Sequence, residues 1–158
     1  MQTANKTIDE LDSYSKTLHQ KLFGLAIPSN PDTKSRAEVT SILRSANEFM
    51  TRKAFDYLNE HPFSGNKAKS LFCKKTDVLV TTVFELVHYR FHPLPSRSKS
   101  QSLSLVAIGG YGRGEMAPYS DVDLLFLSPH RQTGWAKSVI ESILYILWDL
   151  KFKVGHSS

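Results

Sequence analysis

The segment IGGYGRGEMAPYSDVDLLFL, residues 108–127, decides the fold of the second half of this chain. The aliphatic run that leads into it, residues 103–109, predicts a short buried strand. Residues 109–114 contain four glycines, which disfavour regular helix and strand and predict a loop. Residues 121–127, DVDLLFL, predict a second strand. The segment therefore predicts a strand, a glycine-rich loop and a second strand.

Two carboxylates, Asp121 and Asp123, lie at the start of the second predicted strand. Residues i and i+2 of a strand project from one face, so the two backbone positions are expected roughly 6–7 Å apart. Like charges at this spacing disfavour each other's ionisation, and a bound cation relieves the repulsion. Carboxylate oxygens with open positions beside them suit Mg²⁺ that also contacts substrate phosphates. The alternative is a pair of solvent-facing acids at a strand edge.

Gly109 and Gly110 end the first predicted strand. A short spacer, residues 111–120, separates them from the two acids. Glycine lets the main chain approach a phosphate closely and offer its N–H groups. A flexible loop without a ligand is the alternative for the glycines alone. The combination predicts a phosphate-binding loop beside a two-carboxylate metal site, an arrangement that serves in-line displacement on a nucleoside triphosphate.

Two other glycine motifs do not fit the segment. A P-loop requires Lys followed by Ser or Thr directly after its last glycine, and neither pair follows these glycines. A dinucleotide-binding fingerprint that starts at Gly110 requires glycine at position 115, which is Glu115.

The string GGYGRGEMAPYSDVDLLFL, residues 109–127, resembles the signature of the PII uridylyltransferase family. This family lies within the DNA polymerase beta-type nucleotidyltransferases, whose pattern is Gly-[Gly/Ser], a spacer, and two acids separated by one apolar residue. Residues 146–157, ILWDLKFKVGHS, resemble the continuation of the same family. The resemblance is specific over residues 106–157, weaker over about 36–105 and absent before that.

The resemblance implies a reaction and a set of roles. Gly109 and Gly110 are expected to hold the β- and γ-phosphates of UTP, and Asp121 and Asp123 to be catalytic residues that bind Mg²⁺. The expected reaction transfers UMP to a tyrosine hydroxyl of the PII signalling protein and releases pyrophosphate. Two alternatives stay open: another protein nucleotidyltransferase, such as glutamine synthetase adenylyltransferase, or a non-catalytic nucleotide-binding or structural remnant.

Arg113 and Ser120 are further candidates for nucleotide binding. In a functional role, Arg113 contacts a phosphate or packs the loop through an ion pair with an acid. The alternative is a solvent-exposed arginine. Ser120 either bonds the nucleotide where the strand starts or forms an ordinary turn. His156 matches a family motif position, with a structural or substrate-positioning role expected before a catalytic one. Tyr119 is expected to pack rather than react.

The chain is expected to be an α+β protein. Residues 1–35 predict a weakly ordered segment, and residues 36–95 a helical region whose apolar side chains recur every three or four positions. A polar linker, residues 96–102, precedes a nucleotidyltransferase core, residues 103–158, with a polymerase beta-like mixed sheet and covering helices. The periodic apolar residues between 135 and 150 predict an amphipathic helix.

The core is expected to be truncated. The family has a third carboxylate on a later strand, whereas the last acid of this sequence, Asp149, falls at the end of the predicted helix. A third strand is expected to start at residues 152–154 and to be cut short at Gly155. The 158-residue chain alone is therefore expected to be poorly stable and inactive.

The composition fits a folded, mildly basic protein, with 41% hydrophobic residues and a formal net charge of +5. This charge permits a nucleotide substrate, and with the basic residues scattered no nucleic-acid partner is expected. One cysteine, Cys73, excludes an intramolecular disulfide and fits a reducing compartment. The first residues lack a secretory signal and no apolar run is long enough to cross a membrane, so a cytoplasmic location and no membrane partner are expected.

Overall fold

The computed structural model describes residues 2–94, 102–129 and 132–158, with only the backbone described for residues 2–4. The predicted linker, residues 96–102, therefore lies outside the described residues except for Ser102. The elements in chain order are α1 (Gln2–Phe23), α2 (Thr33–Glu60), α3 (Gly65–Leu86) with a π-helical turn (Val87–Phe91), β1 (Ser104–Ala107), α4 (Gly109–Gly112), β2 (Val122–Leu127), α5 (Gly134–Asp149) and β3 (Val154–Ser157).

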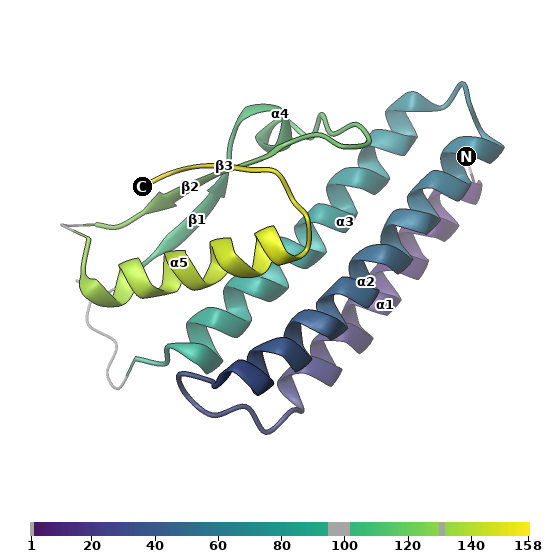
Figure 1. Cartoon of the computed structure of the whole chain (residues 1–158). Helices are drawn as coiled ribbons and strands as arrows, with labels where there is room; N and C mark the ends of the chain where they lie inside the picture. Colours follow the sequence, from purple (N-terminus) through teal and green to yellow (C-terminus); the bar gives the residue numbers. More distant parts are fainter. Residues whose placement is uncertain (1, 95–101, 130–131) are drawn as a thin grey trace.

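Three long helices form one layer of the molecule, and α3 lies between the α1–α2 pair and the α5–sheet half (Figure 1). Asp32 caps the start of α2 by accepting a hydrogen bond of 2.8 Å from the backbone N–H of Ser35. One stripe of α2 is buried at helical spacing: Val39, Thr40, Leu43, Ala46, Met50, Ala54 and Tyr57. α2 therefore packs through one face, whereas α3, which contacts α1, α2 and α5, is buried on more than one side.

The first helix differs from the sequence prediction of weak order for residues 1–35. Residues Gln2–Phe23 form a 22-residue helix. Leu11 and Leu22 are completely buried and Leu18 is 3% exposed, because α1 packs against both α2 and α3. Glu10 also accepts a 2.9 Å ion-paired hydrogen bond from Lys53 on α2. Tertiary packing therefore orders a segment whose polar composition predicts little structure.

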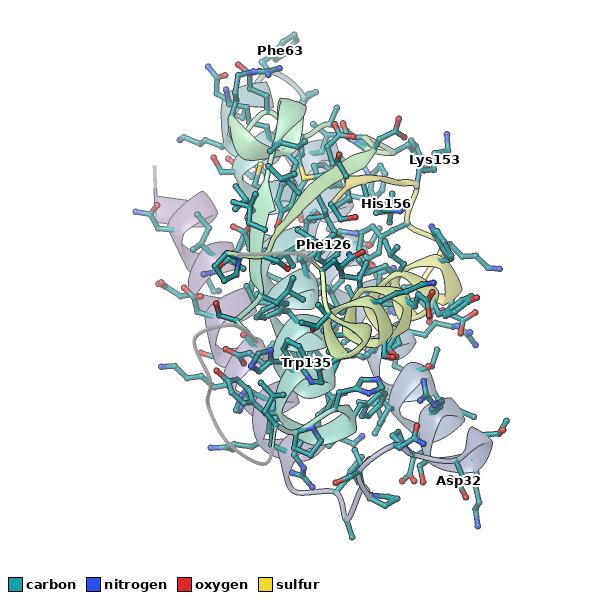
Figure 2. All side chains as sticks on the ribbon, turned by 90° about the vertical axis from the view of Figure 1, so that its left-hand side faces the viewer. Asp32, Phe63, Phe126, Trp135, Lys153 and His156 are labelled. Atoms are coloured by element: carbon teal, nitrogen blue, oxygen red, sulfur yellow. The ribbon has the colours of Figure 1, made fainter. Side chains whose placement is uncertain are left out.

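The sheet has the strand order β1-β2-β3, with β1 antiparallel and β3 parallel to the central β2. Val122, Leu124 and Phe126 alternate along β2 and are buried, and Figure 2 shows Phe126 among the core side chains while Phe63 projects at the α2–α3 turn. The predicted α+β class, a helical region followed by a mixed sheet with covering helices, is confirmed.

Two local predictions are wrong. Residues 109–112 form a short helical turn, α4, where the glycines predict only a loop. The third strand also does not stop at Gly155, because β3 runs through Val154–Ser157 and pairs with β2 along its length. None of the helices in the described ranges is both long and apolar enough to cross a membrane.

A lysine lies inside the interface between the helices and the sheet half. Lys75 on α3 is 9% exposed, and its ammonium donates a 2.8 Å hydrogen bond to the side-chain oxygen of Asn47 on α2. The same ammonium lies 4.9 Å from the ring centroid of Phe152. Burial lowers the pKa of Lys75 to about 8 because the charged form loses its hydration.

We predict that Lys75→Met raises the free energy of unfolding at pH 7 by about 1–3 kcal/mol, because it removes a buried charge while keeping the side-chain length. The oxygen of Asn47 keeps its hydrogen bond from Thr51 in the variant. Below pH 8 the folded and unfolded states of the wild-type chain both carry the charge, so the penalty is complete. Between about pH 8 and 10.5 only the unfolded state binds the proton, so wild-type stability rises with pH toward that of the variant.

Urea denaturation of both proteins between pH 7 and 10.5 measures this difference. A Met variant that is less stable at pH 7, with a gap that does not depend on pH, would contradict the account.

Candidate functional site

The carboxylate of Asp123 lies between two glycines that come from different parts of the chain. Asp123 sits on β2 opposite Gly155 on β3, and its carbonyl accepts a 3.0 Å hydrogen bond from the N–H of Ile108. A Cβ placed on Gly109 would overlap Oδ2 of Asp123, and a Cβ placed on Gly155 would overlap Oδ1. Both positions therefore have to lack a side chain for this carboxylate to occupy its place.

The glycine segment turns sharply at the end of β1. Gly109 has φ +60°, a left-handed conformation that favours glycine, and it starts α4. A Cβ on Gly112 would overlap the carbonyl oxygen of Ala107, so α4 packs directly against β1. These constraints explain why the segment forms a compact helical turn instead of an open loop.

Tyr111 links the glycine turn to the helical layer through a hydrogen bond. Its side chain is 7% exposed, and its hydroxyl donates a 2.7 Å hydrogen bond to Asp77 on α3. Burial, followed by the hydrogen bond to Asp77, raises the pKa of Tyr111 well above its usual value, so the hydroxyl remains a donor. The glycine turn is therefore held by a long helix that sequence reasoning assigned no role at the site.

Asp121 is the residue directly before β2, and its side chain is exposed. The turn that leads to it is closed by Ser120, whose side-chain oxygen accepts a 2.9 Å hydrogen bond from the N–H of Ala117. On the other side of Asp121, the N–H of Val122 donates a 2.8 Å hydrogen bond to the carbonyl of Lys153. The backbone of Asp121 is therefore bounded by hydrogen-bonded residues, while its carboxylate is accessible to solvent.

Arg113 and Tyr119 lie in the same turn, and each has its described partner elsewhere than at Asp123. The Nε of Arg113 donates a 2.8 Å hydrogen bond to Oε2 of Glu115, and both side chains are exposed. This pairing lowers the pKa of Glu115. Tyr119, expected to pack, is 85% exposed with φ +68°, because it occupies the tip of the turn. Its ring contacts only Phe55 among the aromatic residues described, at 6.0 Å between centroids.

His156 lies on the face of the sheet away from Asp123. It pairs with Leu124, which is buried against the helices, and its ring lies 6.5 Å from that of Trp148 on α5. Directly paired residues project from the same face of a sheet. His156 therefore does not face the Asp123 carboxylate, and its expected structural or substrate-positioning role stays a prediction.

The donor set fits a hard cation that takes oxygen ligands. Both oxygens of Asp123 lie against glycine backbone, and Asp121 precedes it by two residues with an exposed carboxylate. In the described ranges, no group of three or more His, Cys, Asp or Glu side chains is arranged to hold a metal. Any cation here would therefore take its other ligands from water or a substrate.

Sequence reasoning missed the part that Gly155 plays. The residue looks like the end of a strand when it is considered alone, because glycine interrupts strands. Its function becomes visible only when β3 pairs in parallel with β2 and brings position 155 opposite Asp123. The available signal was that Gly155 itself belongs to the string of residues 146–157 that resembles the continuation of the family.

Residues 94–155 match the family described as nucleotidyltransferase domain. The match contains β1, the glycine turn, β2 and α5, and it reaches Gly155. It therefore covers both glycines that flank the carboxylate of Asp123. No solved structure matches the chain significantly.

Three curated relatives are named bifunctional uridylyltransferase/uridylyl-removing enzyme. The protein of Ruegeria pomeroyi is 45% identical over 123 residues, 78% of this chain and 14% of the relative. That of Erythrobacter litoralis is 41% identical over 133 residues, 84% of this chain and 14% of the relative. That of Cereibacter sphaeroides is 57% identical over 83 residues, 52% of this chain and 9% of the relative. The chain thus spans about one seventh of the length of the first two relatives.

We predict that Gly155→Ala lowers the free energy of unfolding by about 1–2 kcal/mol, because the new methyl group overlaps the Asp123 carboxylate. In an Asp123→Ala background, Gly155→Ala should lower the free energy of unfolding by a smaller amount, since the overlapping oxygen is gone. Gly134→Ala is the matched control, because a Cβ at that position meets no atom within 4 Å. Chemical denaturation of the four proteins of the cycle and the control measures these differences. Equal costs for Gly155→Ala in the two backgrounds would show that the glycine does not serve Asp123.

Proposed function

We propose, from the nucleotidyltransferase domain that residues 94–155 form and the uridylyltransferase relatives, that the protein carrying this chain transfers UMP from UTP to a tyrosine hydroxyl of the PII signalling protein. The bond between the tyrosine oxygen and the α-phosphorus forms, the bond from the α-phosphorus to the bridging oxygen breaks, and pyrophosphate leaves. The proposed location of this reaction is the cytoplasm.

The observation that carries the proposal is the position of the Asp123 carboxylate between Gly109 and Gly155. A nucleotidyl transfer needs an acid held rigidly beside main chain that can approach phosphate. Gly109 and Gly110 put backbone without side chains at the end of β1, and Gly109 lies directly against that acid. This juxtaposition supports a role for both glycines in holding the β- and γ-phosphates of UTP.

Asp121 and Asp123 are proposed to hold Mg²⁺, with Asp123 as the fixed ligand and Asp121 as the accessible one. When bound, the ion would offset the charge of the triphosphate and of the departing pyrophosphate. The contribution of the chain is orientation: the backbone bonds at Ile108 and Val122 fix the strand on which the two acids stand. Held in this way, the carboxylates need little rearrangement when the phosphates arrive.

Arg113 and Ser120 are proposed as secondary contacts to the nucleotide. Arg113 is exposed and, among the described residues, forms its ion pair with Glu115, so its guanidinium can exchange that carboxylate for a phosphate without unfolding any structure. Ser120 already bonds the backbone of Ala117, which supports a role in shaping the turn beside Asp121. We therefore expect Arg113 to affect UTP affinity and Ser120 to affect the placement of Asp121.

We predict that Asp121→Asn and Asp123→Asn each lower UMP transfer at least about 100-fold, because each removes a charged oxygen ligand with little change in shape. Transfer of label from [α-³²P]UTP to purified PII protein, with Mg²⁺ and the protein that carries this chain, measures the reaction. Asp149→Asn is the matched control, since Asp149 lies exposed at the end of α5.

The nucleotide and acceptor are tested in the same assay. Labelled ATP in place of UTP, and glutamine synthetase in place of PII, examine the adenylyltransferase alternative. Preferential labelling of glutamine synthetase from ATP would overturn the uridylyl assignment while keeping nucleotidyl transfer. Transfer that persists in both Asn variants would overturn the carboxylate site itself.

A further inference from the structure

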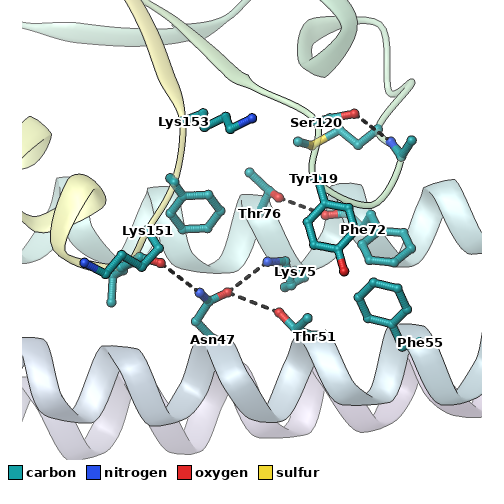
Figure 3. A pocket seen from close by; sticks show the side chains of 14 residues that line it. Asn47, Thr51, Phe55, Phe72, Lys75, Thr76, Tyr119, Ser120, Lys151 and Lys153 are labelled. Carbon is teal, nitrogen blue, oxygen red and sulfur yellow. Dashed lines mark hydrogen bonds between the residues drawn. The ribbon is translucent and has the colours of Figure 1, made fainter.

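A pocket of about 280 Å³ lies beside the candidate site but contains none of the four residues assigned there to phosphate and metal. Its walls come from α2, α3, the turn before Asp121 and the segment between α5 and β3 (Figure 3). This volume is just below the range of drug-sized ligand sites, about 300–1,000 Å³. The pocket therefore suits a small organic molecule and is too small for a folded peptide.

The charge of the pocket is of one sign. Lys75, Lys151 and Lys153 line it, and no Asp or Glu does. Lys75 forms the floor and is nine-tenths buried, whereas the other two lysines are exposed near the rim. Figure 3 shows the Lys153 side chain extending over the pocket and the Lys75 ammonium pointing from α3 toward Asn47 on α2.

The buried ammonium of Lys75 has a neutral hydrogen-bond partner, and no ion pair to an acid is seen in the described part of the chain. Among the described residues, its recorded contacts are the 2.8 Å hydrogen bond to Asn47 and the ring of Phe152 at 4.9 Å. An ammonium group has three donors, and a buried charge normally pairs with an opposite charge. Lys75 therefore has unused capacity to bind an anion on the side that faces the pocket.

Aromatic side chains form a large part of the remaining wall, beside the polar Asn47, Thr51, Thr76 and Ser120. Phe55 and Phe72 meet edge to face at 5.4 Å between centroids, and Tyr119 lies 6.0 Å from Phe55 at the rim. Phe152 forms part of the wall between α5 and β3. Aromatic faces of this kind favour a planar or hydrophobic body over a strongly hydrated ion.

We propose that this pocket binds a small organic anion, with its carboxylate or phosphate group on Lys75 and Lys153 and its planar body against the aromatic walls. The pocket lies outside the four residues proposed to hold phosphate and metal and shares only Ser120 with the proposed UTP contacts. Its existence does not depend on the proposed transferase activity. Its occupant would contact the turn that leads to Asp121, since Tyr119 and Ser120 belong to the pocket wall. Binding here would consequently restrain the residue next to the proposed metal ligand.

The test is a calorimetric titration of the chain with four probes: benzoate, phenyl phosphate, inorganic phosphate and benzyl alcohol. We expect an organic anion to bind at least about 10-fold more tightly than inorganic phosphate or benzyl alcohol, because only it has both the charge and the aromatic body. The relative affinities of benzoate and phenyl phosphate show which anionic group the pocket prefers.

The variants locate the binding. Lys75→Met should weaken it at least about 10-fold, and Lys153→Met, at an exposed position that leaves the core intact, should weaken it by a smaller factor. Lys137→Met is the matched control, because Lys137 is an exposed lysine of α5 whose recorded ion pair is with Glu141. Asp123→Asn should leave the affinity unchanged, which separates this site from the proposed metal site.

Absence of binding by both organic anions at millimolar concentration would overturn the proposal. Binding that neither lysine variant weakens would overturn it as well, since the anion would then lie elsewhere. If Asp123→Asn abolishes UMP transfer while organic-anion binding persists, the pocket stands on its own. If UMP transfer does not depend on Asp123, the proposed transferase site is wrong, while the evidence for organic-anion binding in the pocket is unchanged.

Discussion

The constraint on which the site depends is the absence of side chains on both sides of one carboxylate. Asp123 stands on the central strand, with Gly109 against one oxygen and Gly155 against the other. A methyl group at either position would force the carboxylate to move, so the two glycines determine where its charge lies. One comes from the turn after β1 and the other from β3, which means that the whole three-stranded pairing has to form before the acid is positioned.

The helical layer contributes to this arrangement through α3. This helix holds the glycine turn by the hydrogen bond between Asp77 and Tyr111, and its Lys75 faces the segment that leads into β3. The face of the sheet that carries Val122, Leu124 and Phe126 is buried, whereas Asp123 belongs to the alternate positions of β2. The buried face of β2 therefore packs toward the helices, whereas Asp123 projects from the other face and is partly exposed.

Much of the fold could be predicted from patterns that are local in the sequence. The alternation in residues 121–127 predicts β2, and the apolar spacing in residues 36–95 and 135–150 predicts long helices, because one buried face determines each element. The glycine and aspartate candidates could likewise be chosen from their spacing. The order of α1 was underestimated: its leucines show only a weak helical pattern in the sequence, and Leu11, Leu18 and Leu22 become buried through contacts with α2 and α3.

The features that sequence reasoning did not reach depend on pairing across the chain. Gly155 meets Asp123 through the parallel register of β2 and β3, and Lys75 becomes buried through the packing of Asn47 and Phe152 around it. Neither partner is near in the sequence. The helical turn at Gly109–Gly112 was also missed, since glycine disfavours helix and the contacts that hold the turn, such as the hydrogen bond from Tyr111 to Asp77 on α3, come from other parts of the chain.

The central claim is that the carboxylate between Gly109 and Gly155 is, together with Asp121, the cation site of the chain. Paramagnetic broadening by Mn²⁺, a substitute for Mg²⁺ in oxygen sites, tests it most directly in a ¹H–¹⁵N NMR titration. We expect the amides of residues 109–110, 121–123 and 155 to broaden first, and Asp123→Asn to remove this broadening. Broadening that instead starts at the acids of α1, Glu10 and Asp12, and persists in the Asn variant would contradict it.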